Sequence, residues 1–372
     1  MLVYYLLLIG SLAIGIPLCR LKHGKKIYCG LAGVALFLVA ALRSGVGYDY
    51  NLYGNLFYQY QSESELFLSI HKEEKGFVIP VKYLAYATDD YQIMFVVIAA
   101  IITAAVMLYI YFYTEKAYLG VFCFLAFGVF FNSMCFMRQM IAASILLFAM
   151  QYIKKKQFYR FAVLVLFASV FHVSALVMLV FYFLLRIKMN WISLGVYSGI
   201  LVLYFIFSEK ALEFITKYVY TGYQLGSNAE ITGGITPIYM IFFGIFFVLA
   251  FAVRKRLCEK DSFNNVLINC MFFDVFFEAM GAKHAVISRF AILFIIPAIT
   301  VLVPQVITVY MELCKEKFGK NKKKLMASKA AVLAAFAVFC TGMYTFMIVN
   351  NYNGVYPYQT IFSERGTEDA EQ

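Results

Sequence analysis

Long apolar runs follow one another along the whole chain, separated by short polar segments. The runs are continuous and do not alternate with polar residues, and many approach the roughly 20 apolar residues that a helix needs to cross a bilayer. This pattern predicts an all-α polytopic integral membrane protein with about 10–12 transmembrane segments in one domain, residues 1–372. The first run lacks the basic leader and cleavage site of a signal peptide, so we expect a retained helix. The expected apolar segments are Leu2–Leu18, Ile27–Leu42, Tyr91–Tyr113, Tyr118–Phe136, Met140–Ile153, Phe161–Leu185, Trp191–Phe207, Ile238–Val253, Val266–Met280, Phe290–Val309 and Met326–Val349.

The composition supports a lipid environment. Hydrophobic residues make up 63% of the 372 residues and charged residues only 14%, whereas soluble domains are roughly 45–50% apolar. The net charge of +11 comes from Lys and Arg in short loops, which is a topology signal. We therefore expect no nucleic-acid partner. The eight cysteines and four histidines show no metal-ligand spacing, so we expect no metal site and no cofactor.

The distribution of Lys and Arg orients the expected helices. The positive-inside rule places the loops at Lys154–Arg160, Arg254–Arg256 and Lys315–Lys324 in the cytoplasm. The segment 43–90 is then outside, and it holds seven acidic residues against four basic ones. Its mixed apolar and charged stretches predict a long outer loop with amphipathic helices that lie on the bilayer. The other segments expected outside are residues 208–236 and the tail 350–372.

One run does not fit this topology as a simple span. Three apolar runs separate Lys156 from Arg254, although both residues are expected on the same side. The simplest solution is that Phe161–Leu185 is a broken or re-entrant helix with its break at the polar residue His172, because irregular backbone at membrane depth is tolerated when it lines a cavity or is buried in protein. The rival solution is a misread span within Tyr118–Ile153.

Several polar residues lie at the expected outer surface, where lipid-linked chemistry would take place. Arg43 and Asp49 stand directly behind the apolar run that ends at Leu42, together with tyrosines. Arg138 lies between two apolar runs, and Arg289 begins another. Charged groups near hydrocarbon are costly, so they tend to be functional. Several arginines at one surface suit a pyrophosphate, which accepts bidentate hydrogen bonds.

Each of these residues also has a structural explanation. Asp49 after Gly47 is typical of a turn or a helix N-cap. Arg138 can extend its guanidinium to the interface while its stem stays in hydrocarbon. His172 can be a core histidine bonded to a carbonyl, and Arg289 an ordinary charge at a helix end. The sequence contains no P-loop, dinucleotide fingerprint, zinc-protease helix or nucleophile elbow, which disfavours an energy-coupled pump.

A set of short motifs resembles the EpsG family of bacterial exopolysaccharide proteins, which are similar to Wzy-type polymerases. The motifs occur in family order and span nearly the whole chain. One departure is Ser44, where the family usually has an aromatic residue. The matching residues are Leu42-Arg43-Ser44, Gly47-Tyr48-Asp49-Tyr50 with Tyr53, Glu74-Lys75-Gly76-Phe77, Arg138-Gln139 with Ala142, Lys155-Lys156 with Phe161, Phe171-His172-Val173-Ser174-Ala175, Ser288-Arg289-Phe290 and Val355-Tyr356-Pro357-Tyr358.

The resemblance implies a multi-pass polymerase in the bacterial cytoplasmic membrane, acting in exopolysaccharide or capsule biosynthesis. It would join undecaprenyl-pyrophosphate-linked oligosaccharide repeat units at the outer face, alone or with other polysaccharide-assembly proteins. A fold like that of GT-C glycosyltransferases is a related expectation. Positive charge for the leaving pyrophosphate would come from Arg43, Arg138 and Arg289. The base for the acceptor hydroxyl would be Asp49 or, second, His172.

The remaining motif residues are expected to contact the substrate. They are Tyr50, Tyr53, Glu74 and Gln139. A metal-free mechanism fits the arginines, although Asp49 with Glu74 is also a pair that suits a divalent cation in the manner of GT-C enzymes.

Two other classes of function remain open from the sequence. A flippase or exporter of lipid-linked sugar would suit the broken helix and the basic residues equally well. A membrane acyltransferase that decorates the polysaccharide, with His172 as its base, is a third hypothesis.

Overall fold

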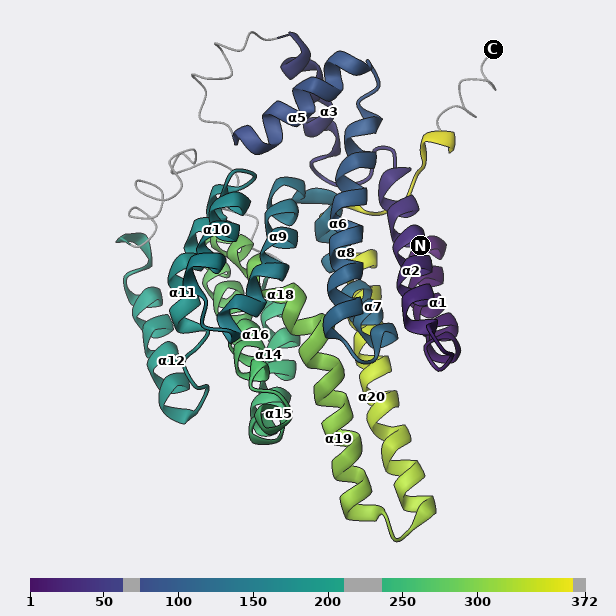
Figure 1. Cartoon of the computed structure of the whole chain (residues 1–372), viewed down its shortest axis with the longest axis vertical. Helices are drawn as coiled ribbons and strands as arrows, with labels where there is room; N and C mark the ends of the chain where they lie inside the picture. Colours follow the sequence, from purple (N-terminus) through teal and green to yellow (C-terminus); the bar gives the residue numbers. More distant parts are fainter. Residues whose placement is uncertain (63–73, 211–235, 364–372) are drawn as a thin grey trace.

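The protein is a bundle of helices that run mostly along one direction (Figure 1). The computed structural model describes residues 1–62, 74–210 and 236–363, and all named elements within these ranges are helices. This confirms the all-α fold expected from the continuous apolar runs. The apolar stretch Leu66–Ile70 of the outer loop and most of residues 208–236 fall outside the described residues.

The first half of the chain supplies the loop helices and the spans that flank them. Its elements are α1 (Leu2–Leu18), α2 (Gly24–Ala41), α3 (Tyr50–Ser62), α5 (Lys75–Ala87), α6 (Gln92–Tyr113), α7 (Ala117–Ala126), α8 (Val129–Cys135), α9 (Met137–Lys154), α10 (Phe158–Ser169), the 3₁₀ helix η1 (Val173–Val177) and α11 (Met178–Leu184).

The second half contains the most enclosed helices. Ala285–Phe318 forms a nearly continuous helical stretch, and 94% of its 18-residue apolar window is buried. Its elements are α12 (Trp191–Ile206), α14 (Thr236–Ala252), α15 (Arg254–Lys260), α16 (Phe263–Gly281), α17 (Ala285–Ser288), η3 (Arg289–Ala291), α18 (Ile292–Pro297), the π-helix η4 (Ala298–Leu302), α19 (Val303–Phe318), α20 (Lys322–Val349) and η5 (Tyr352–Gly354).

By length and composition, 4 helices of the described chain can cross a membrane, or up to 6 if each sharply bent pair is one span. Shorter apolar helices of 10–17 residues, such as α1, α10 and α12, stand beside them. The structure thus supports a polytopic membrane protein, and the total of about 10–12 segments stays a prediction.

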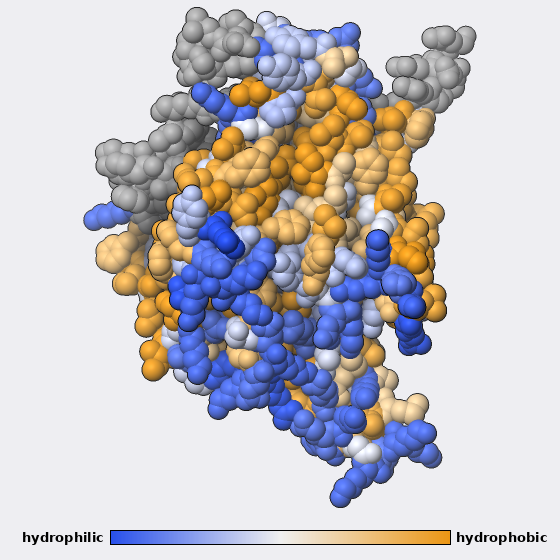
Figure 2. All heavy atoms as spheres, viewed as in Figure 1, coloured by the Kyte–Doolittle hydropathy of each residue, from blue (hydrophilic) through white to orange (hydrophobic). Residues whose placement is uncertain are grey.

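Polar and apolar surfaces separate along the long axis. Hydrophobic residues form a broad band across the middle of the molecule, and hydrophilic residues gather below it (Figure 2). We call the lower end, formed by α15, the start of α16 and the tip of the α19–α20 hairpin, the basic end. The opposite end, formed by α3, α5 and residues 350–363, is the loop end (Figure 1).

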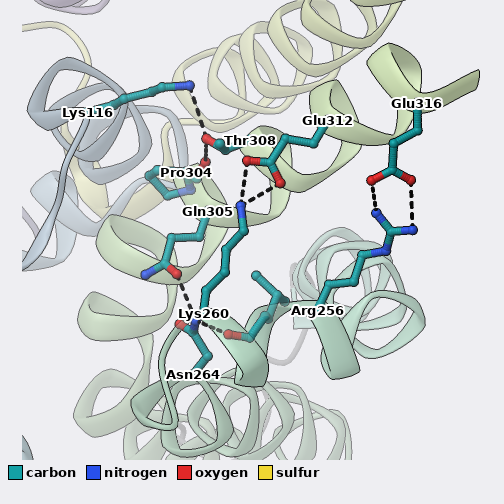
Figure 3. Close-up of polar contacts among 10 residues, drawn as sticks. Lys116, Arg256, Lys260, Asn264, Pro304, Gln305, Thr308, Glu312 and Glu316 are labelled. Carbon is teal, nitrogen blue, oxygen red and sulfur yellow. Dashed lines mark hydrogen bonds and ion pairs between the residues drawn. The ribbon is translucent and has the colours of Figure 1, made fainter. Parts of the chain in front are cut away.

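Ion pairs join the helices of the basic end (Figure 3). Arg256 of α15 donates two hydrogen bonds to Glu316 of α19, at 2.6 and 2.9 Å. Lys260 pairs in the same way with Glu312, one turn earlier on α19. Such exposed pairs contribute little stability singly, but they fix α15 against α19 where the apolar band ends.

The break at His172 has the geometry of a re-entrant segment. Before it, Lys154 at the end of α9 pairs with Asp261 just ahead of α16, at 2.7 Å. After it, the carbonyl oxygen of Ile187 accepts a 3.0 Å hydrogen bond from Asn265 in the first turn of α16. The chain therefore enters α10 and leaves α11 at the same end of the bundle. This agrees with the interpretation of Phe161–Leu185 as a segment that does not cross.

The rival region, Tyr118–Ile153, is also divided. α7 and α8 meet at an angle of 59°, and α9 begins afresh at Met137. The apolar run Tyr118–Phe136 is thus one bent pair rather than one straight helix.

The C-terminal segment packs onto the start of the outer loop. The Gly47 N–H donates to the Gly354 carbonyl oxygen at 2.9 Å, and the Tyr48 N–H donates to Asn353 at 3.0 Å. Gly47 has a φ of +105°, and a Cβ there would lie 2.9 Å from the Met134 carbonyl oxygen. Only glycine fits this turn without a shift of the backbone, so Gly47 sets the direction in which Asp49 and α3 leave the membrane helix.

Candidate functional site

Glu74, Arg138 and His172 meet at the loop end from three distant parts of the chain. Glu74 Oε2 lies 3.1 Å from Arg138 Nη1, and Glu74 Oε1 lies 2.5 Å from His172 Nδ1. Val173 N–H donates to the same Oε1 at 3.1 Å. The side chains of Arg138, Glu74 and His172 remain 30%, 15% and 14% exposed. The cluster is therefore enclosed enough to strengthen the electrostatic interactions between its side chains, and it is still accessible from outside the protein.

The environment keeps Glu74 ionised. Burial raises the pKa of this carboxyl, but hydrogen bonding and charge from His172, the charge of Arg138 and the Val173 N–H together bring the pKa below its usual value. A carboxylate can only accept hydrogen bonds. His172 Nδ1–H is thus the donor, and in the neutral ring the lone pair lies on Nε2, as in a histidine base oriented by a carboxylate.

The main chain brings the loop helix against the broken helix. Gly76 N–H donates to the Val170 carbonyl oxygen at 2.9 Å. A Cβ on Gly76 would lie 2.7 Å from that oxygen, so a side chain here would push α5 away. The close approach places Glu74, just before α5, beside His172 in the break.

Asp49 lies in the electrostatic field of two arginines. It immediately precedes α3 and is half-buried. Burial raises the pKa of Asp49 above its usual value, while the positive charges of Arg289 and Arg138 act in the opposite direction. Asp49 therefore shares its electrostatic environment with both cations.

Gln139 connects α9 to the helix that carries Arg289. Its Nε2 donates to the Arg289 carbonyl oxygen at 2.6 Å. The Arg289 guanidinium lies 5.4 Å from the centre of the Phe136 ring, just ahead of α9. Gln139 and Phe136 together hold Arg289 against the start of α9.

Aromatic rings complete the surroundings of Arg138. Its guanidinium carbon lies 5.9 Å from the centre of the Tyr53 ring and 5.7 Å from that of Phe77, within the range of cation–π attraction. Arg138 is thus fixed by Glu74 and two rings, and it does not simply extend alone toward the surface as the snorkelling explanation expects.

Comparison with known proteins gives one result that covers most of the chain. The model of the EpsG family matches residues 26–360. The chain belongs to the EpsG family. No curated protein and no solved structure matches it. Membership fits a membrane protein of exopolysaccharide biosynthesis.

The motifs typical of the EpsG family coincide largely with this site. The structure brings together seven of the expected residues and separates two. Those that meet are Asp49, Tyr53, Glu74, Arg138, Gln139, His172 and Arg289.

Arg43 and Tyr50 lie to one side, inside the protein. Arg43 is 2% exposed, and it donates to the carbonyl oxygens of Ala40 and Met134 at 3.1 and 3.0 Å. The Tyr50 hydroxyl donates to Gln92 Oε1 at 2.8 Å. From the sequence, both residues are expected to contact the substrate. In the structure, the Arg43 guanidinium and the Tyr50 hydroxyl instead donate hydrogen bonds to other groups of the protein. We therefore assign Arg43 and Tyr50 a supporting position in this EpsG protein.

The arrangement of Glu74 bears on the divalent-cation alternative. Both of its oxygens are engaged, one by Arg138 and the other by His172, so holding a cation with Asp49 would require Glu74 to leave these partners. Within the described residues, no group of three or more His, Cys, Asp or Glu side chains is placed to bind a metal ion.

Two acidic residues lie inside the apolar run Val266–Met280, and none of the sequence motifs includes them. Asp274 and Glu278 stand one turn apart on α16, and Asp274 is 1% exposed. Asp274 Oδ2 has no hydrogen-bond partner among the described residues. The sequence alone marks these two residues as unusual, because two carboxyls at i and i+4 within an apolar membrane segment are rare.

Proposed function

We propose that this EpsG protein polymerises lipid-linked oligosaccharide repeat units, the polyprenyl pyrophosphate being the leaving group. The observation that carries the proposal is the cluster of Arg138 with Glu74 and His172 at the end of the bundle opposite the basic end, with Asp49 in the electrostatic field of Arg138 and Arg289. By the positive-inside rule the basic end faces the cytoplasm. The arginines and Asp49 then face the outer leaflet, where exported repeat units are found.

The residues supply what a glycosyl transfer of this kind needs. The acceptor hydroxyl oxygen of one unit attacks the anomeric carbon of the growing chain, and the bond from that carbon to the pyrophosphate oxygen breaks. The electron pair leaves with the pyrophosphate, whose negative charge Arg138 and Arg289 stabilise. Asp49 accepts the proton of the hydroxyl. Burial makes its carboxylate a stronger base, since it raises the pKa.

His172 and Glu74 have a second role in this proposal. Glu74 orients the imidazole through Nδ1 and holds Arg138 by its other oxygen. The pair thereby positions the arginine at the pyrophosphate. His172 Nε2 is the alternative base if Asp49 proves dispensable.

The test is to replace Asp49 and locate the lipid-linked unit. Asp49→Asn keeps the shape of the side chain and removes the base. We expect single repeat units exposed on the outer leaflet and no polymer, measured with an impermeant glycosidase on intact cells. Units retained on the cytoplasmic side would instead assign the protein to transport. Polymer of unchanged length would remove Asp49 from the chemistry.

A further inference from the structure

An apolar cavity of about 200 Å³ opens beside the candidate site. It lies between α5, α6 and α9, and its lining includes Pro80, Ile101 and Ile141. No polar surface contributes to its wall. Pro80 and Ile101 are exposed, so the cavity is a groove open on one side. We call it the α5–α6 groove.

The groove extends from the loop end into the depth of the membrane. Ile101 is nine positions along α6 from Gln92, which at 1.5 Å per residue is about 14 Å below the loop end of that helix. α6 is one of the helices long and apolar enough to cross a membrane, and Ile101 is 44% exposed. The open side of the groove therefore faces the hydrocarbon of the leaflet on the loop side.

The upper end of the groove adjoins the charged cluster. Its lining includes Gly76 and Phe77, which follow Glu74 in sequence. The guanidinium carbon of Arg138 lies 5.7 Å from the centre of the Phe77 ring. Phe171, also in the lining, directly precedes His172. A molecule in the groove would thus have its hydrocarbon against α6 and its head beside Arg138.

We propose that the α5–α6 groove binds the polyisoprenoid tail of the lipid-linked substrate, with the pyrophosphate at Arg138. The inference rests on the proposed function. It assigns a binding site to the hydrocarbon tail of the substrate, which lies in the leaflet on the loop side. A wall without polar surface suits hydrocarbon, and a cationic guanidinium at one end suits a diphosphate head. The remainder of a long tail stays in the bilayer.

Occupancy is tested by photo-crosslinking on the full-length protein in nanodiscs. A photoreactive p-benzoylphenylalanine replaces Ile101, and in a matched control it replaces Ile245, an isoleucine of similar exposure on the apolar helix α14. The probe is radiolabelled polyprenyl pyrophosphate without sugar. We expect several-fold more crosslinking at position 101 than at position 245. Equal crosslinking of the probe at the two positions would overturn the proposal. So would crosslinking of position 101 to phosphatidylglycerol that an excess of the probe does not reduce.

A second measurement blocks the groove. Ile101→Trp places an indole over the open side, and Ile245→Trp on α14 is its control. We expect the Ile101 variant to need several-fold more lipid-linked substrate for half-maximal polymerisation, with little change at saturation, because tail binding and not the chemical step is impaired. An unchanged substrate requirement contradicts the inference.

The two proposals fail in different ways. If Asp49→Asn stops polymerisation while position 101 does not crosslink the probe, the polymerase function stands and the groove assignment falls. If the probe crosslinks at position 101 while Asp49→Asn leaves polymer unchanged, the groove binds the lipid and the proposed chemistry falls.

Discussion

The main chain of Gly76 is hydrogen-bonded directly to the carbonyl of Val170, at 2.9 Å. This contact joins the outer-loop helix α5 to the end of the half-helix α10. Glu74 on one side of the contact and His172 on the other are thereby brought within hydrogen-bond distance. The cluster of Glu74, Arg138 and His172 therefore depends on the close approach of two main-chain segments, α5 and the end of α10, as well as on its own side chains.

Gly76→Ala tests this approach. The new Cβ would lie 2.7 Å from the Val170 oxygen, so α5 must move, at a cost of about 1–3 kcal/mol. We expect a lower thermal unfolding midpoint in detergent and little polymer. Gly199→Ala in α12 is the control, because nothing lies within 4 Å of its Cβ. If the Gly76 variant matches this control in both measurements, the close contact has no consequence for the site.

The pairing of Glu74 with Arg138 predicts sensitivity to geometry as well as charge. Arg138→Lys keeps the charge but loses the planar fork, and Glu74→Gln removes the charge that orients it. Loss of a charged hydrogen bond from Arg138 to the pyrophosphate costs about 1.5–3 kcal/mol, so we expect polymerisation to fall by roughly tenfold to a hundredfold in each variant.

Polymer yield per unit of membrane protein measures this effect. A double variant that loses no more than the worse single one indicates that Glu74 acts through Arg138. Wild-type chain lengths in Arg138→Lys would show that the fork geometry is not used.

Much of the fold follows from hydropathy and charge, and some of it does not. The all-α class and the helix break at His172 could be predicted, because apolar length and the sides of basic loops constrain topology. The 59° bend between α7 and α8 was not, because the run Tyr118–Phe136 is continuously apolar. Hydropathy measures the environment of a helix and not its direction.

The site was predictable as a set of residues but not as a set of contacts. Glu74 and His172 are 98 positions apart, and a single sequence holds no information on such pairing. Arg43 was placed at the substrate because it ends an apolar run, but the turn after it directs its guanidinium toward the Met134 carbonyl. Which way a side chain points from an irregular turn depends on tertiary packing.

Acid should weaken the contribution of Glu74 to stability. Its pKa is below the usual 4.5 in the folded protein, so the folded state stays ionised to lower pH than the unfolded state. The stabilisation is present above about pH 4.5 and is lost as the pH falls through the lowered value. The unfolding midpoint of the wild type should therefore exceed that of Glu74→Gln at neutral pH, and the gap should narrow below pH 4.5. A gap that widens in acid would contradict this sign.

Cysteine labelling checks the re-entrant segment. On a background without native cysteines, Lys156→Cys and Lys188→Cys stand before and after it, and both positions are exposed. We expect an impermeant maleimide to label both only after permeabilisation. Tyr83→Cys, exposed on α5, should be labelled in intact cells. Labelling at position 188 from outside would mean that Phe158–Leu184 crosses the membrane.

Arg43 and Arg138 should fail in different ways when changed. Arg43 is buried and bonds two main-chain carbonyls, so Arg43→Met removes charged hydrogen bonds that contribute roughly 1.5–3 kcal/mol each at most. We expect a lower unfolding midpoint and reduced protein in the membrane, with normal polymer per folded molecule. Arg138→Met should show the opposite, namely normal protein levels and little polymer. The paired measurements are thermal unfolding in detergent and polymer length. An Arg43 variant that folds normally and makes no polymer would return Arg43 to the substrate, and would indicate that the turn at Gly47 opens during the reaction.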